Sequence, residues 1–126
     1  MKRVTLILII GFGAILRFFG LSVSPPSLNW DEAALGYNAY SLMETGKDEY
    51  GKYFPVFTRS FDEYKSAVPM YMMIPAIKLM GLNEVGVRAT TALLGTISIF
   101  IIFIIGQEIF RREWAALSAA WVFAIE

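Results

Sequence analysis

Two adjacent carboxylates, Asp31 and Glu32, stand in the stretch SLNWDEAALGYNAYSLMETG, directly after a hydrophobic segment and a Pro-Pro pair. A carboxylate can act as a general base. Neighbouring residues of a helix point about 100° apart, so the two acids cannot face each other as a glycosidase pair does. One could act on a substrate while the other orients or binds. The alternative is structural, because acids in the first turn of a helix stabilise it by roughly 0.3–1 kcal/mol.

Other charged side chains accompany this pair. Lys65 follows a second acidic pair, Asp62 and Glu63, in SFDEYKSAVP. Arg17 lies within the outer part of the first hydrophobic segment, and Arg88 begins the second. An arginine in hydrocarbon is costly unless it reaches the interface or meets an anion. Acids and bases on one surface suit an anionic lipid headgroup beside an activated hydroxyl. A network of ordinary surface ion pairs would use the same residues.

Composition excludes several kinds of chemistry. The chain has no cysteine and no histidine, so disulfides, thiolate chemistry and histidine bases are absent. The formal net charge is zero and no basic tract is present, so nucleic acid is not an expected partner. Any chemistry must use carboxylates, lysines, arginines and tyrosines.

The hydrophobic residues occur in blocks that predict membrane helices. Of the 126 residues, 56% are hydrophobic and only 17% are charged. Residues 89–107, ATTALLGTISIFIIFIIGQ, are uncharged and as a helix would reach about 29 Å, the thickness of the bilayer hydrocarbon. Residues 4–23 contain one charge and predict a first transmembrane helix. The basic start also fits a cleaved signal peptide, but Pro25 follows the only small-residue cleavage site.

A third apolar block, residues 114–126, reads as the start of another transmembrane helix. We therefore expect the chain to be the N-terminal fragment of one polytopic membrane domain. Lys2, Arg3, Arg111 and Arg112 flank the first two helices on one side, which predicts a cytoplasmic N-terminus and an outer loop over residues 24–86.

The outer loop is expected to hold two juxtamembrane helices. The first covers residues 31–44, with Asn29 as N-cap and Gly46 as its stop. Residues 45–61 read as a polar and aromatic loop. A second, interfacial or re-entrant helix follows from about residue 67, and Lys78 lies near its end. All six tyrosines lie between Tyr37 and Tyr71, which suggests a segment held at the headgroup level.

The order of LRFFGL, PPSLNWDEAALGYNAYSLMETG, GLNEVGVR and GQEIFRR resembles the N-terminal part of the membrane glycosyltransferases of the GT-C superfamily. The nearest branch contains protein O-mannosyltransferases and lipid A aminoarabinose transferases. Such enzymes are polytopic and transfer a sugar from a polyprenyl-phosphate donor on the outer membrane face.

The resemblance implies roles for some of these charged residues. Asp31 matches the family's catalytic base, and Glu32 would orient or support it. Lys65 and Arg88 would bind the substrate or its phosphate, and Arg17 is a further candidate because an arginine in hydrocarbon can meet an anion. The family's Glu-Lys-Pro motif is matched with different spacing by Glu63, Lys65 and Pro69 in EYKSAVP. Glu63 would bind a divalent metal ion if one is used.

These observations predict an all-α integral membrane protein with two transmembrane helices, a truncated third and juxtamembrane helices in the first outer loop. The predicted activity is inverting transfer of a sugar from a polyprenyl-phosphate donor to a lipid, glycan or protein acceptor. The alternative is a non-catalytic two-span membrane protein whose amphipathic loop binds lipid or a partner subunit.

Overall fold

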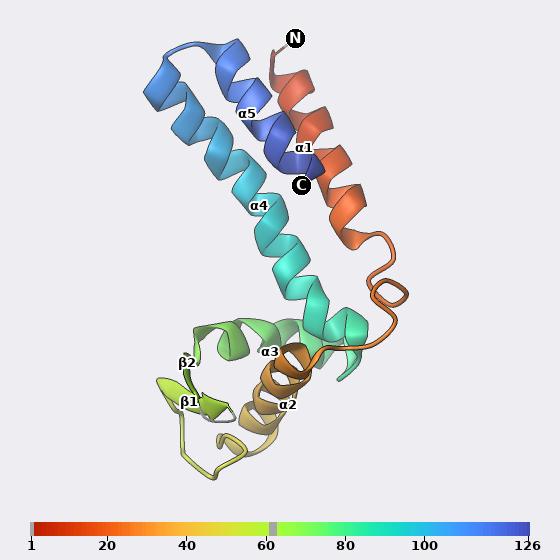
Figure 1. Cartoon of the computed structure of the whole chain (residues 1–126), viewed down its shortest axis with the longest axis vertical. Coiled ribbons are helices and arrows are strands. Elements are labelled where there is room, and N and C mark those ends of the chain that lie inside the picture. The colour runs from red at the N-terminus through yellow and green to blue at the C-terminus, as the bar shows by residue number, and fades with distance from the viewer. Residues whose placement is uncertain (1, 61–62) are drawn as a thin grey trace. The chain divides into compact units, whose positions relative to one another are not determined.

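The computed structural model describes residues 2–60 and 63–126 and is mostly helical in these ranges (Figure 1). Its helices and strands are α1 (Lys2–Phe18), α2 (Trp30–Thr45), β1 (Phe57–Ser60), β2 (Glu63–Ser66), α3 (Val68–Met80), α4 (Glu84–Phe110) and α5 (Glu113–Ile125). The mainly helical prediction is confirmed. The strictly all-α prediction is wrong, because β1 and β2 form an antiparallel hairpin.

The first strand of the hairpin, β1, lies within residues 45–61, where the sequence predicted a loop. Phe57 pairs with Ser66, and Thr58 pairs with Lys65. The Thr58 side chain is buried, and its hydroxyl donates a hydrogen bond to the Met70 sulfur at 3.5 Å. Burial of Thr58 against α3 therefore stabilises a hairpin that the Gly and Pro punctuation of residues 45–61 did not suggest.

The chain divides into two compact units. The first unit is formed by Met1–Phe19 with Thr91–Glu126, and the second by Gly20–Thr90. Helix α4 begins in the second unit and continues into the first. Each unit has its own hydrophobic core.

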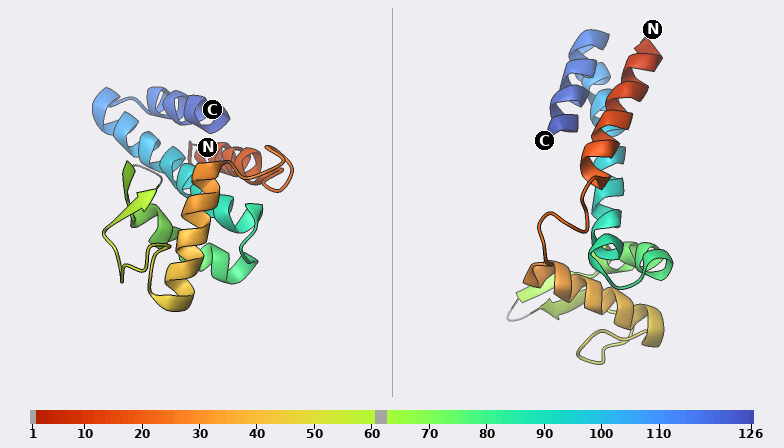
Figure 2. Two further views of the ribbon diagram at one scale, coloured as in Figure 1. Left: turned by 60° about the horizontal axis from the view of Figure 1, so that its bottom comes forward. Right: turned by 90° about the vertical axis from the view of Figure 1, so that its right-hand side faces the viewer.

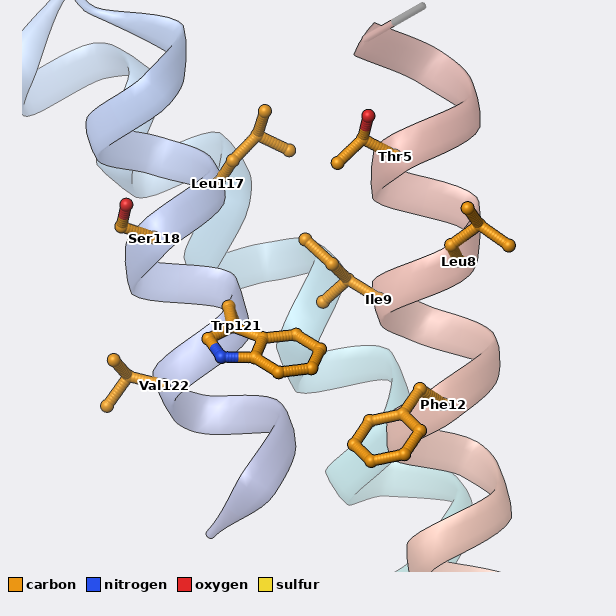
Figure 3. A pocket seen from close by; sticks show the side chains of 8 residues that line it. All are labelled: Thr5, Leu8, Ile9, Phe12, Leu117, Ser118, Trp121 and Val122. Carbon is orange, nitrogen blue, oxygen red and sulfur yellow. The ribbon is translucent and has the colours of Figure 1, made fainter.

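The first unit packs α1 and α5 together with the later turns of α4. Its core consists of Ile9, Ile99, Ala120 and Ala124. Alanines recur every fourth residue along the buried side of α5, at Ala116, Ala120 and Ala124, and such small residues let helices approach closely. Between α1 and α5 lies an apolar groove of about 710 Å³ (Figure 3), lined by Thr5, Leu8, Ile9, Phe12, Leu117, Ser118, Trp121 and Val122.

Only α4, among the described helices, is long and apolar enough to cross a membrane, by length and composition. The predicted span over residues 4–23 is shorter than expected, because α1 ends at Phe18 and turns follow. Gly20 has a φ of 75°, which helical backbone does not allow. Helix α5 falls on the predicted block over residues 114–126. Crossing by α1 and α5 stays a prediction.

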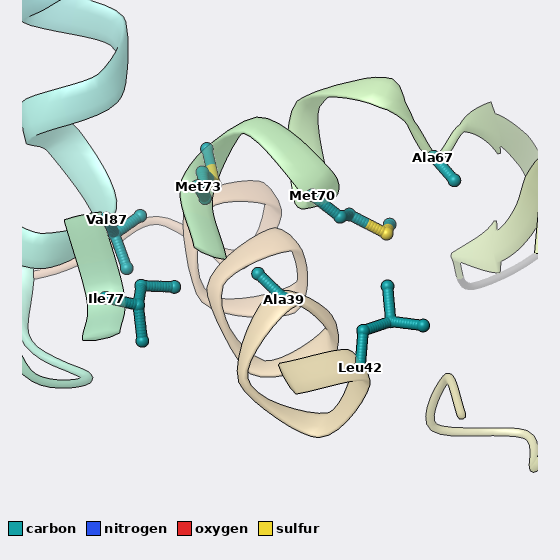
Figure 4. Packing of buried hydrophobic residues seen from close by; sticks show 7 residues of the cluster. All are labelled: Ala39, Leu42, Ala67, Met70, Met73, Ile77 and Val87. Atoms are coloured by element: carbon teal, nitrogen blue, oxygen red, sulfur yellow. The ribbon is translucent and has the colours of Figure 1, made fainter. Parts of the chain in front are cut away.

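The second unit is built on α2 and α3, which pack against each other (Figure 2). Its core residues are Ala39, Leu42, Ala67, Met70, Met73, Ile77 and Val87 (Figure 4). Val87 comes from the first turn of α4 and approaches α2 at Gly36, where an added Cβ would lie 2.6 Å from Val87 Cγ2. A glycine there lets α4 begin directly against α2.

Candidate functional site

The site is built on the N-terminus of α2, a helix for which the sequence predicted both an N-cap, Asn29, and a stop, Gly46. The Asn29 side chain accepts a hydrogen bond from the Glu32 amide at 2.8 Å, and the Glu32 carboxylate accepts one from the Asn29 amide at 3.1 Å. This reciprocal capping box satisfies two amides that the helix itself leaves unpaired. At the other end, Gly46 adopts the left-handed conformation, with φ at 69°. The predicted helix and its caps are confirmed.

Glu32 is held on its other side by Arg88. The guanidinium donates from Nε to Glu32 Oε1 at 3.0 Å and from Nη2 to Oε2 at 3.1 Å. These two bonds form the fork geometry that arginine makes with a carboxylate. The hydrogen bonds from Arg88 lower the pKa of the Glu32 carboxyl, so Glu32 stays ionised.

Arg88 also binds the backbone of the segment that precedes α2. Its Nη1 donates to the carbonyls of Leu21 at 2.8 Å and Pro25 at 2.9 Å, and its Nη2 donates to that of Ser27 at 2.8 Å. A guanidinium has five N–H donors, and all five are engaged here. The side chain is 7% exposed. Arg88 could bind a phosphate only by giving up one of these bonds.

Asp31 has a different environment from its neighbour. Its carboxylate forms an ion pair with the Lys65 ammonium. The Asp31 side chain is 57% exposed and that of Lys65 is 30% exposed, so a substrate can reach both. The sequence predicted that these acids and bases share one surface, and the structure brings Asp31 to Lys65 and Glu32 to Arg88.

Glu63 lies two residues before Lys65 on β2, so the two residues share one face of the hairpin. Glu63 is exposed. Within residues 2–60 and 63–126, no group of three or more acidic side chains gathers where it could hold a metal ion. Asp62, the residue before Glu63, lies outside the described residues. Among the described residues, the donor set around Glu63 therefore does not fit a divalent ion.

Arg17 belongs to the first unit and is engaged there. Its guanidinium donates to the carbonyls of Phe123 at 2.7 Å and Ala124 at 2.9 Å, in the last turn of α5. It also lies 5.4 Å from the centre of the Phe123 ring. Arg17 therefore joins α1 to α5 within the first unit.

Sequence reasoning missed two parts of this arrangement. The first is the reciprocal bond that the Asn29 amide donates to the Glu32 carboxylate, although the N-x-x-E spacing of NWDE signals a capping box. The second is the set of three carbonyls that Arg88 binds. No residue type marks a backbone carbonyl as a ligand, so no sequence signal was present for it.

The chain matches no protein-family model, no curated protein and no solved structure. The resemblance to GT-C glycosyltransferases stays a prediction from the motifs.

Proposed function

We propose that the start of α2 is the acid–base site of a membrane glycosyltransferase, with Asp31 as the general base. The supporting observation is the contrast between the two adjacent acids. Glu32 is fixed by Arg88 and by the capping box. Asp31 is more than half exposed and its partner is a lysine, whose flexible side chain can move away when a substrate arrives.

The proposed reaction uses a sugar linked to polyprenyl phosphate as donor. The acceptor hydroxyl oxygen attacks the anomeric carbon while Asp31 takes the hydroxyl proton. The bond between that carbon and the phosphate oxygen breaks, polyprenyl phosphate leaves, and the configuration inverts. The Lys65 ammonium would leave Asp31 and donate to a phosphate oxygen, where negative charge develops.

The proposal gives Glu32 and Lys65 different roles. Glu32 orients the first turn of α2 and with it Asp31. Lys65 binds the phosphate group. Helix α4 would anchor the site to the membrane that holds the lipid-linked donor, with the second unit on the outer face. The acceptor class, whether lipid, glycan or protein, is left open by the residues at the site.

A second candidate is a non-catalytic membrane protein whose outer segment binds lipid. The exposed side of α3 favours it, because large apolar side chains such as Val68, Met72 and Leu79 face outward there. A helix that is apolar on its buried and exposed sides suits a lipid surface better than water. In this candidate the ion pairs of Asp31 and Glu32 only stabilise the fold.

Asp31→Asn separates the two candidates. We expect it to lower sugar transfer from a polyprenyl-phosphate donor by about 10²–10⁴-fold, because the base is lost. The protein would be assayed in vesicles, with circular dichroism to show that its helices are retained. Glu44→Gln is the matched control, because Glu44 is an exposed acid near the other end of α2. Undiminished transfer by Asp31→Asn would refute the base assignment, and no transfer by the wild-type protein would favour the second candidate.

A further inference from the structure

We propose that Arg88 is a positioning residue that holds the segment before α2 and the first turn of α2, and thereby the place of Asp31, and that it does not bind an anionic substrate. The structural part of this proposal is independent of the activity. The part that concerns Asp31 as a base rests on the proposed function.

The first argument is the saturation of the guanidinium. Its five donors meet both carboxylate oxygens of Glu32 and three backbone carbonyls. A guanidinium has no further N–H to offer. Since Arg88 is almost fully buried, a phosphate would have to displace Glu32 or a carbonyl and also reach a group with little exposed surface.

The second argument concerns what Arg88 binds. The carbonyls of Leu21, Pro25 and Ser27 all belong to the stretch between α1 and α2, which is neither helix nor strand. Within it, the amides of Val23 and Ser24 bond back to the Gly20 carbonyl at 2.9 Å each. Backbone groups outside helices and strands bond to side chains or to water. Arg88 supplies partners at three points, so the conformation of this stretch depends on one side chain.

The third argument links Arg88 to Asp31. Glu32 is the third residue of α2 and bonds to both Asn29 and Arg88. Asp31 immediately precedes it, with the two Cα atoms about 3.8 Å apart. A shift in the first turn of α2 therefore moves the Asp31 carboxylate relative to Lys65. Arg88 acts on Asp31 through Glu32, without contact to a reacting atom.

Arg88→Lys distinguishes positioning from phosphate binding. Lysine keeps the positive charge and is itself a common phosphate ligand. It has only three donors on one nitrogen and cannot make the fork to Glu32 while reaching three carbonyls. A phosphate ligand would tolerate this substitution, whereas a positioning residue of this geometry would not.

The first measurement is amide hydrogen exchange of the full chain in lipid nanodiscs. In Arg88→Lys we expect exchange at the amides of Ser24, Asn29 and Glu32 to rise by about tenfold or more, as expected when charge-assisted hydrogen bonds are lost. Arg112→Lys is the matched control, because Arg112 is exposed in the other unit. Unchanged exchange in Arg88→Lys would overturn the proposal.

Glu32→Gln tests the same link if Arg88→Lys fails to fold. It retains the size of the side chain but removes the charge that receives the fork. We expect exchange at Asn29 and Ser24 to rise about threefold or more, since a charged hydrogen bond becomes a neutral one. Wild-type exchange at both amides would show that Glu32 does not transmit the effect of Arg88, and would overturn the proposal.

The second measurement compares binding with turnover. The probe is undecaprenyl phosphate in nanodiscs, with undecaprenol as the uncharged reference. We expect Arg88→Lys to keep phosphate-dependent binding within about twofold and to lower kcat with little change in KM, because the base is misplaced while the phosphate contact remains. Lost binding with normal hydrogen exchange would show that Arg88 is a phosphate ligand and overturn the proposal.

Lys65→Gln distinguishes a failure of the proposed function from a failure of the proposal for Arg88. Under the proposed function it weakens phosphate-dependent binding of undecaprenyl phosphate. If binding is unchanged in Lys65→Gln, the phosphate role of Lys65 is wrong. The structural role of Arg88 is still decided by the exchange of the amides before and within the first turn of α2.

Discussion

The two units each contain an arginine that binds backbone carbonyls, but the two arginines differ in what balances their charge. Arg17 donates to the last turn of α5 and lies against the Phe123 ring. Arg88 donates to three carbonyls and also to a carboxylate, that of Glu32. The partners of Arg17 are neutral carbonyls and an aromatic ring, whereas a full negative charge balances Arg88.

This difference has consequences for stability. Loss of Arg17 removes hydrogen bonds to neutral carbonyls. Loss of Arg88 also removes the charged partner of the ionised Glu32 carboxylate, and a charge-assisted hydrogen bond is worth more than a neutral one. The second unit should therefore depend on its arginine more strongly than the first unit depends on Arg17.

The largest expected effect comes from removing each guanidinium in turn. In Arg88→Gln we expect amide exchange over residues 20–33 to rise by roughly a hundredfold, because several hydrogen bonds are lost together. In Arg17→Gln we expect a rise of about tenfold, confined to the end of α5. Hydrogen exchange followed by mass spectrometry measures both. Equal effects in the two units would contradict the comparison.

The second-largest expected effect is that of pH, which should change amide exchange in the second unit and not in the first. Arg88 lowers the folded-state pKa of Glu32 below its ordinary value of 4.5. The stabilisation from this pair is therefore complete above that ordinary value and is lost as pH falls through the lowered one. We expect exchange over residues 20–33 to accelerate in that range, as measured by a pH series corrected for intrinsic rates.

Glu32→Gln provides the control for the pH series. It removes the titrating carboxylate, so the acid-dependent acceleration at the start of α2 should be much weaker. The carbonyls that Arg17 binds do not titrate, so the end of α5 should show no corresponding change. Acceleration that persists unchanged in Glu32→Gln would assign the effect to another group.

The smallest expected effect concerns the cap of α2 alone. Asn29→Ala removes the side-chain acceptor of the Glu32 amide and leaves the bonds of Arg88 in place. We expect a loss of about 1 kcal/mol in the free energy of unfolding, measured by chemical denaturation. Glu44→Ala is the control near the other end of α2, since Glu44 is exposed. If Asn29→Ala lowers the free energy of unfolding as much as Arg88→Gln does in the same denaturation experiment, the cap and not the guanidinium holds this region.

Local features of the fold could be predicted because neighbouring residues encode them. Asn29 and Gly46 mark the ends of α2, and both caps are present. The uncharged run over residues 89–107 predicts a helix of spanning length, and α4 contains it. The end of α1 at Phe18 was predicted five residues too late, because hydrophobicity continues past Gly20 while the backbone turns.

Features that join distant residues could not be predicted in the same way. The hairpin depends on burial of Thr58 against Met70. The sequence of two short strands near Gly and Pro residues does not indicate this contact. The candidate site was predicted as a set of residues, but its pairing was not. The sequence suggested Arg88 as a phosphate ligand, and its geometry in the structure favours a positioning role.

The sequence by itself determined the kinds of groups at the start of α2, the helix that carries them and the long apolar helix α4, because capping and hydrophobicity act over a few residues. Only the tertiary structure decided that Glu32 is held by a buried arginine while Asp31 can be reached by a substrate. Arg88 lies 56 positions from Glu32, and Lys65 lies 34 positions from Asp31. Packing of α2 against α3 and the first turn of α4 brings these charges together, and it is this packing that makes two adjacent carboxylates chemically different.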